Sequence, residues 1–255
     1  MLRSAVIAGV VSILPFIPWT IRNWQTFHVF EPLAPRYAVD PGQSTNPGFN
    51  HWTKAICMDF ACTADIYWNG GTDIISASTL PARAFSSPRV RAATLKLLAD
   101  YNRAKVLTPS IDARFGRLAT CILQAHPLRY YVELPVARLA DMWLRPRTEM
   151  LPVALRWWQY SKHPGQTTFA AAYAFLNLVF LLAALRGIVK RPPFWGVMLA
   201  FVLLRCALLA TLEAPEPRYT LECFPMIFLL SAIAFTQRDA GSVNTITNHK
   251  EPLTQ

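Results

Sequence analysis

The feature of this sequence that most constrains its fold is the distribution of its charged residues. Asp, Glu, Lys and Arg are absent from four apolar stretches, 5–21, 168–185, 194–204 and 223–235. Only 16% of the 255 residues are charged and 53% are hydrophobic, whereas about a quarter of a soluble domain is charged. Apolar runs separated by polar segments are typical of helices that cross a bilayer. The sequence therefore predicts an all-α membrane protein with about four transmembrane helices and a mostly helical outer loop region.

The apolar runs divide the chain into four regions. The first transmembrane span is expected over 1–21, with a bend near Pro15 and Pro18. A cleaved signal peptide is the less favoured alternative there, because no small-residue cleavage site follows the apolar run. A three-span C-terminal bundle is expected over 168–236, and a disordered cytoplasmic tail rich in Asn, Thr and Gly over 237–255.

The basic residues predict the topology. The segment RGIVKRPP, residues 186–193, joins two apolar runs and holds basic residues but no acid, which is typical of a cytoplasmic loop. Four spans then leave both chain termini in the cytoplasm and place 22–167 outside as an extracytoplasmic loop. The 17 basic residues of that loop do not oppose this topology, because long loops cross membranes largely regardless of charge.

Within the long loop, the first and second halves give different signals. Residues 31–81 have a loop-like density of Pro, Gly, Asn and Ser, which predicts an irregular segment. From Pro88 onwards, apolar residues recur at helical spacing and predict amphipathic helices. Their expected buried faces hold Val90, Leu97, Leu98 and Tyr101 in the first helix, and Ile111, Phe115, Leu118 and Ile122 in the second.

Local signals set the expected limits of these helices. Ser110 is the expected N-cap of the second helix, His126-Pro127 ends it, and a third piece runs from Leu128 to about Leu144 with a break at Pro135. We expect these helices to have too little apolar surface for a large independent core. Either the helices lie on the membrane surface as an interfacial layer, or they present a solvated face over a small helical core.

Several classes of function have little support. The net charge of +10 is spread along the chain rather than gathered on one helix or in a tail, which disfavours nucleic-acid binding. The five cysteines, Cys57, Cys62, Cys121, Cys206 and Cys223, have no zinc-ligand spacing, so we predict no metal site. Cys57 and Cys62 either form a disulfide in an oxidising compartment or remain free thiols. No motif identifies a catalytic residue or a cofactor.

Two arginines near the third and fourth apolar runs could bind a phosphate. Arg205 lies inside an apolar run, where a charged side chain is costly and usually faces the bundle and a partner, or extends to the interface. Arg218 and Tyr219 lie in a turn with Glu213, Glu216 and Glu222. A hairpin of the two runs would bring Arg205 and Arg218 together, where two guanidiniums suit a lipid phosphate. Local pairing of Arg218 with the glutamates is the alternative.

Three segments resemble a known family in the same order. PWTIRNWQTFHVFEPL (18–33), AHPLRYYVELPVARLADMW (125–143) and EPRYTLECFPMIFLLSAIAF (216–235) resemble parts of the bacterial relatives of dolichyl-phosphate-mannose protein mannosyltransferases, which include the aminoarabinose transferases of lipid A. The resemblance implies a multi-span, inverting GT-C glycosyltransferase of a bacterial inner membrane. Such enzymes take a sugar from a polyprenyl-phosphate carrier on the outer face.

The resemblance covers only the C-terminal part of such an enzyme. The family's catalytic acid lies in the first outer loop, and no position of this sequence matches that loop, so no catalytic residue is transferred. The matching positions implied to lie near the carrier phosphate are Arg22, Asn23, Glu216, Pro217, Arg218 and Tyr219. We therefore expect a glycosyltransferase-like protein that is inactive without a missing N-terminal half. A non-enzymatic assembly or scaffold subunit of a membrane complex is the alternative.

Overall fold

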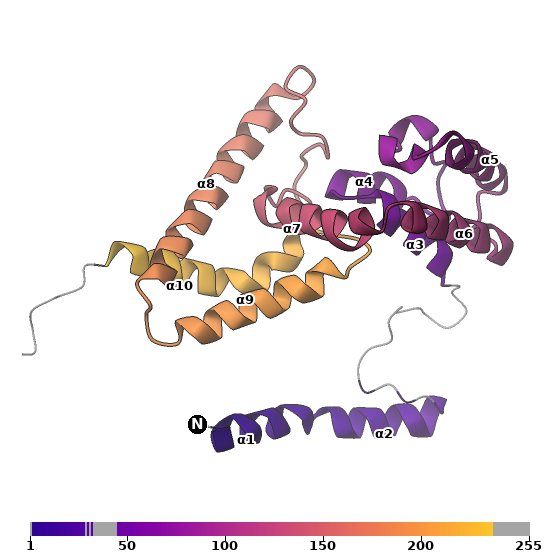
Figure 1. Cartoon of the computed structure of the whole chain (residues 1–255). Helices are drawn as coiled ribbons and strands as arrows, with labels where there is room; N and C mark the ends of the chain where they lie inside the picture. The colour runs from indigo at the N-terminus through magenta and orange to yellow at the C-terminus, as the bar shows by residue number, and fades with distance from the viewer. Residues whose placement is uncertain (1, 29, 31, 33–44, 237–255) are drawn as a thin grey trace, which may run out of the picture. The chain divides into compact units, whose positions relative to one another are not determined.

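The computed structural model describes residues 2–28, 30, 32 and 45–236 of the chain (Figure 1). These described ranges contain helices and connecting segments but no strand, which confirms the predicted all-α class. The chain divides into two units, Met1–Asn46 and Pro47–Gln255, and each is described by itself. The tail predicted over 237–255 lies outside the described residues.

The first unit holds two consecutive helices, α1 (Leu2–Ile13) and α2 (Phe16–Phe27). The expected bend near Pro15 is a break between them, whereas Pro18 continues inside α2. Pro18 lies in the first turn of α2, where the missing N–H of proline has no helical partner to lose. The single span expected over 1–21 is thus two helices of 12 residues each, and each measures about 18 Å at helical rise.

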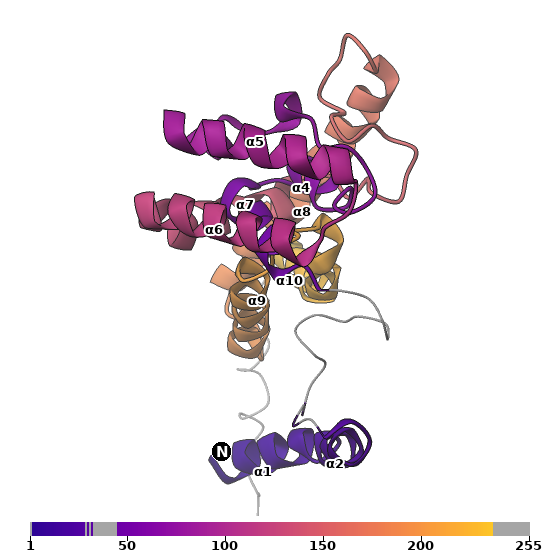
Figure 2. The same ribbon diagram turned by 90° about the vertical axis from the view of Figure 1, so that its right-hand side faces the viewer.

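The second unit begins with a group of helices that precede the apolar C-terminal part. They are α3 (Pro47–Ile56), α4 (Phe60–Ile66), the 3-10 turns η1 (Ala77–Thr79) and η2 (Ala82–Phe85), α5 (Pro88–Ala104) and α6 (Pro109–Ala125). Figure 2 shows α5 and α6 side by side, and α6 also packs on α3. The prediction of an irregular segment over 31–81 was therefore wrong for α3 and α4.

These helices enclose a core of their own, which we call the outer core. Both predicted faces contribute to it, with Val90 partly buried at its edge. Phe49 and Trp52 from α3 pack against Phe115 from α6, with ring centroids 5.2 and 4.8 Å apart. The expectation of too little apolar surface was wrong, because α3 and the turns supply core residues that the sequence pattern did not reveal. The buried members are Phe49, Trp52, Ala55, Ile56, Cys57, Cys62, Ile66, Ile75, Leu80, Ala84, Leu97, Leu98, Tyr101, Leu107, Ile111, Phe115, Leu118, Ala119 and Ile122.

Capping residues explain where the outer helices begin. Ser87 caps α5 by accepting from the amide of Val90. Thr108, not the expected Ser110, caps α6 by accepting from the amide of Ile111, because Pro109 occupies the first helical position. The N-terminus of α3 is capped from a distance: the amide of Phe49 donates to the buried carboxylate of Asp112 in α6, at 2.8 Å.

A single helical run crosses the position of the predicted break at Pro135. Residues Arg129–Glu133 form a π-helical turn, η3, and α7 (Leu134–Leu144) follows without interruption. Proline in a helix clashes with the carbonyl four residues earlier, and a π-helical turn gives that carbonyl room. The predicted end at His126-Pro127 is confirmed, since α6 stops at Ala125.

The C-terminal part consists of α8 (Pro164–Val189), α9 (Trp195–Ala210), η4 (Pro217–Cys223) and α10 (Phe224–Phe235). Within the described residues, two helical stretches are long and apolar enough to cross a membrane, Pro164–Val189 and Pro217–Phe235. The third, Trp195–Ala210, is apolar but shorter. The structure thus supports two such helices rather than the predicted four.

Candidate functional site

The candidate site lies where η4 meets the ends of α7 and α9. Four of the sequence-predicted residues gather here, Arg205 from α9 and Glu216, Arg218 and Tyr219 around η4. The carboxylate of Glu216 is buried, pairs with the Arg218 guanidinium, and accepts a 3.0 Å hydrogen bond from the Tyr219 hydroxyl. The expected alternative, local pairing of Arg218 with a glutamate, is therefore present.

Arg205 also has an acidic partner. Its Nη2 lies 2.9 Å from Oε1 of Glu222, while its buried Nε has no hydrogen-bond partner among the described residues. Each of the two predicted arginines, Arg205 and Arg218, is thus paired with a carboxylate. A phosphate bound here has to compete with Glu216 and Glu222.

The other two predicted residues, Arg22 and Asn23, belong to α2 in the first unit. Nη1 of Arg22 donates to Oδ1 of Asn23 at 3.2 Å, and its guanidinium lies over the rings of Trp19 and Phe27. Cation–π contacts of this kind suit an interfacial arginine among aromatic residues.

Sequence reasoning missed the segment Arg145–Glu149, which follows α7 and packs on η4. Arg147 is buried, and its guanidinium donates to Oδ1 of Asn177 in α8 at 2.9 Å and to the hydroxyl of Thr220 in η4. It also lies over the ring of Phe224 at 4.1 Å. Among the described residues, no carboxylate lies within 4.0 Å of this guanidinium, and its Nε has no partner.

Glu149 is the second unusual group of this segment. Its Oε1 is buried without a hydrogen-bond partner in the described part of the chain. Burial raises the pKa of this carboxyl, and the backbone amides of Glu149 and Arg218 and the nearby Arg145 and Arg147 oppose the rise.

Arg147 lines one wall of an apolar hollow of about 570 Å³. The other walls come from the segment after it, including Met150, and from α8, including Phe169, Tyr173 and Leu176. Met150, Phe169 and Leu176 are exposed. A buried guanidinium beside exposed apolar side chains can bind an amphiphile, with an anionic group on the arginine and hydrocarbon on the helix.

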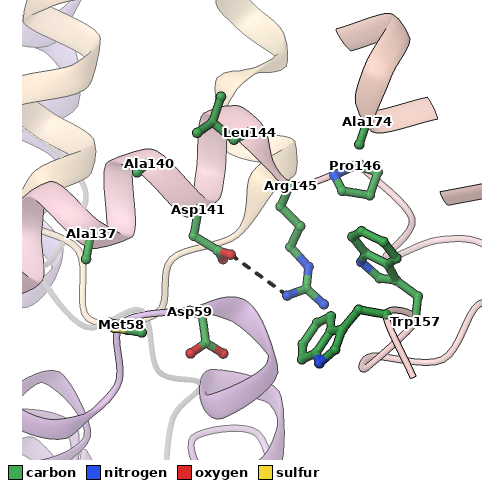
Figure 3. A pocket seen from close by; sticks show the side chains of 11 residues that line it. Met58, Asp59, Ala137, Ala140, Asp141, Leu144, Arg145, Pro146, Trp157 and Ala174 are labelled. Atoms are coloured by element: carbon green, nitrogen blue, oxygen red, sulfur yellow. Dashed lines mark ion pairs between the residues drawn. The ribbon is translucent and has the colours of Figure 1, made fainter. Parts of the chain in front are cut away.

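A second hollow, of about 410 Å³, lies at the end of α7 (Figure 3). Arg145 extends into it beside Trp157 and Trp158, and its Nη1 lies 3.9 Å from Oδ1 of Asp141. The carboxylate of Asp59 lies on the α4 side, where it caps α4 by accepting from the amide of Cys62. Aromatic faces, carboxylates and a guanidinium around one hollow can bind a polar ring, since they combine stacking with hydrogen bonding.

Asp59 is held in place by a disulfide. Cys57 and Cys62 are bonded, which resolves the two alternatives left open by their spacing. The bond joins the end of α3 to α4 on either side of Asp59. Within the described ranges, no cluster of three or more His, Cys, Asp or Glu residues is placed to hold a metal ion.

Comparisons of this chain with protein-family models, with curated proteins and with solved structures found no match.

Asp141 gives the site a testable pH dependence. Burial raises the pKa of its carboxyl above 3.8, although the amide of Phe60, which donates to it at 2.8 Å, opposes the rise. The folded chain then binds this proton more tightly than the unfolded chain, so Asp141 lowers stability as pH rises from about 4 through the raised pKa. Asp141→Asn is expected to remove this decrease, measured as the free energy of unfolding between pH 4 and 7.

Asp100 is the matched control for this measurement. A hydrogen bond from Arg114 lowers the pKa of its carboxyl, so its contribution has the opposite sign and stability rises with pH. Asp100→Asn is expected to remove a rise in the free energy of unfolding at low pH. The decrease in that free energy due to Asp141 is expected to remain. Equal pH profiles for the wild type and Asp141→Asn would contradict the raised pKa.

Proposed function

We propose that this chain is the C-terminal part of a GT-C-like membrane glycosyltransferase system that binds a polyprenyl-phosphate-linked sugar and is inactive alone. The observation that carries the proposal is the buried Arg147, which has neutral hydrogen-bond partners and lines an apolar hollow on α8. A polyprenyl phosphate has the matching chemistry, a phosphate joined to a long hydrocarbon. The resemblance of three segments to the GT-C group supports the same ligand.

The proposed location is a bacterial inner membrane, with four spans, cytoplasmic termini and residues 22–167 outside. The two long apolar helices support membrane insertion. The disulfide between Cys57 and Cys62 supports the outer placement, because disulfides persist in the periplasm and are rare in the cytosol. In this topology α9 is a third span, and α1 with the N-terminal part of α2 is the first.

The two hollows correspond to the two parts of the proposed ligand. The phosphate is assigned to Arg147, with its hydrocarbon along the exposed residues of α8. The hollow with Asp59, Asp141 and the two tryptophans has the chemistry to take a sugar ring. Arg205 and Arg218 remain candidates for the same phosphate, in competition with the carboxylates that pair with them.

The test measures binding of undecaprenyl phosphate to the full chain in lipid nanodiscs. Arg147→Gln is expected to weaken binding by roughly 10-fold or more, since a hydrogen bond to a charged group contributes about 1.5–3 kcal/mol. Arg147→Lys, which keeps the charge but loses the planar donor fork, is expected to recover part of the affinity. Arg103→Gln, at a side chain that is 82% exposed, is the control and is expected to bind normally.

Arg218→Gln in the same assay distinguishes the two arginines. If Arg218→Gln weakens binding and Arg147→Gln does not, the phosphate lies in the cluster favoured by the sequence. If neither variant changes binding while both remain folded, the chain does not use these residues for a carrier.

The alternative function is a non-enzymatic assembly or scaffold subunit. It is favoured by the apolar residues that α8, α9 and α10 leave exposed, such as Phe175, Leu204 and Phe228, which further spans of a larger complex could cover. This alternative expects stable co-purification with a larger membrane protein and no dependence on Arg147.

A further inference from the structure

An apolar stripe runs along one face of the helical segment that ends in α7. Leu128, Val132, Val136, Ala140 and Leu144 follow one another at intervals of four residues, and all five are exposed. Leu128, Val132, Val136 and Leu144 expose between 49% and 64% of their surface. Residues at this spacing share one side of a helix, so the stripe is about 24 Å long at helical rise.

The opposite face of the same helix is buried in the protein. Leu134, Arg138 and Met142 point into the second unit, with exposures of 3% or less. One side of the helix therefore packs on the protein, and no described residue covers the other side. A contiguous exposed apolar surface of this kind marks an interaction site.

The stripe lies beside the apolar helices, because the C-terminal end of α7 is anchored on them. Nε1 of Trp143 donates to Sγ of Cys206 in α9, 3.2 Å away, and its ring stacks on Phe224 of α10 at 6.3 Å. The outer group is fixed to α9 as well, since Nζ of Lys54 in α3 donates to the carbonyl of Thr211. The C-terminal end of the stripe therefore lies near α10, which belongs to the apolar stretch Pro217–Phe235, and near the shorter apolar helix α9.

The neighbouring residues match the chemistry of a bilayer surface. Tyr131, beside the stripe, is 66% exposed, and tyrosine is enriched where membranes meet water. Residues 47–167 hold fifteen basic and eight acidic residues, so this part of the chain attracts anionic headgroups.

We propose that the Leu128–Val136 part of the stripe lies on the outer surface of the bilayer and binds anionic phospholipid, whereas Ala140 and Leu144 line the hollow beside Asp141. The helix then lies in the plane of the interface, and its apolar side chains reach about 5–10 Å into the boundary between headgroups and acyl chains. This inference rests on the membrane insertion in the proposed function and is independent of carrier binding at Arg147.

The test places a nitroxide spin label at Val132 or Val136 of the full chain, in nanodiscs that contain anionic phosphatidylglycerol. The three free cysteines, Cys121, Cys206 and Cys223, are replaced by serine or alanine and the disulfide is kept. Collision rates of the label with oxygen, which concentrates in lipid, and with a water-soluble nickel chelate report the depth of each position.

Labels at two reference positions calibrate the depth measurement. Val106 is 56% exposed in the loop after α5, and it controls for an exposed valine in water. Leu182 is 57% exposed in the C-terminal half of α8, within the apolar stretch 168–185, and its label tests membrane insertion itself. The expected result is a higher oxygen rate and a lower nickel rate at Val132 and Val136 than at Val106, at a depth between those of Val106 and Leu182.

The other outcomes overturn the inference. If the labels at Val132 and Val136 behave like the label at Val106 while Leu182 lies in lipid, the stripe faces water and the membrane assignment stands. If both reagents are excluded from the stripe, another protein surface covers it. If Leu182 also behaves like Val106, membrane insertion is wrong together with the inference built on it.

Discussion

Gly187→Ala is expected to destabilise the C-terminal helices by about 3 kcal/mol, near the upper end of the cost of overpacking. A Cβ atom at this position would lie 1.9 Å from the carbonyl oxygen and 2.7 Å from the carbonyl carbon of Leu230 in α10. The obstacle is backbone rather than a flexible side chain, so α8 and α10 have to separate. Separation also loosens the small cluster that Ala184, Ile227 and Leu230 form between them.

The measurement is the unfolding midpoint of the purified full chain in one detergent, followed by circular dichroism. Gly196→Ala is the matched control, since Gly196 lies in α9 and no atom of the described residues lies within 4 Å of its added Cβ. That variant is expected to be neutral or stabilised by about 0.5–1 kcal/mol, because alanine favours a helix over glycine. Equal shifts for the two variants would show that α8 and α10 do not pack through Gly187.

The helices that were predicted well are those whose signals are local. In α5 and α6 the apolar periodicity, the prolines at the first positions and the polar caps all lie within one segment. The apolar runs of α8, α9 and α10 are local signals as well. The buried faces and approximate starts of α5 and α6, and the presence of the apolar helices α8, α9 and α10, could therefore be obtained from neighbouring residues alone.

The elements that were missed depend on residues far away in the chain. The first amides of α3 bond to Asp112, about 63 residues later, so the sequence around 47 contains no capping signal. Pro135 looks like a helix end, but a π-helical turn before it removes the clash. No pattern of neighbouring residues predicts the capping of α3 by Asp112 or the π-helical turn before Pro135. Both features help to assemble the outer core.

The residues of the candidate site also differ in whether the sequence could predict them. The motif around Arg218 could be found because Glu216, Arg218 and Tyr219 are neighbours in sequence and remain neighbours in space. Arg147 could not be found, since Asn177 and Thr220 lie 30 and 73 residues away. The available sequence signal was a pair of arginines, Arg145 and Arg147, that precede an apolar run. Basic residues are common in such segments whether or not they bind a ligand, so this signal is not specific.

The expected effect of Arg138→Ala is a loss of about 3–4 kcal/mol of stability. Arg138 is fully buried, and burial lowers the pKa of its guanidinium to about 10, so it remains charged at neutral pH. Its Nε and Nη2 donate to the carbonyl of Cys57 at 3.0 Å, and Nη2 also donates to the carbonyl of Lys54. These carbonyls belong to the C-terminal end of α3, where a helix has no donors of its own and carries partial negative charge.

Arg138 is thus a C-cap that α7 supplies to α3, and it joins the helix beside the apolar spans to the outer core. Truncation leaves buried carbonyls without donors, each at about 1–3 kcal/mol, and opens a cavity. Thermal unfolding should show a decrease of roughly 6–16 °C for a chain of this size. Arg138→Met fills much of the volume without donating, so the difference between the two variants separates the cavity from the hydrogen bonds.

Arg129→Ala provides the comparison within the same helical run. Arg129 is partly exposed and its Nε lies 3.9 Å from Oε2 of Glu133, a surface pair that contributes about 0–1 kcal/mol. Its removal is expected to leave the unfolding midpoint nearly unchanged. If Arg138→Ala behaved like Arg129→Ala, the outer core would not depend on α7. The decrease expected instead means that the buried guanidinium of Arg138 stabilises the attachment of α7 to the C-terminal end of α3.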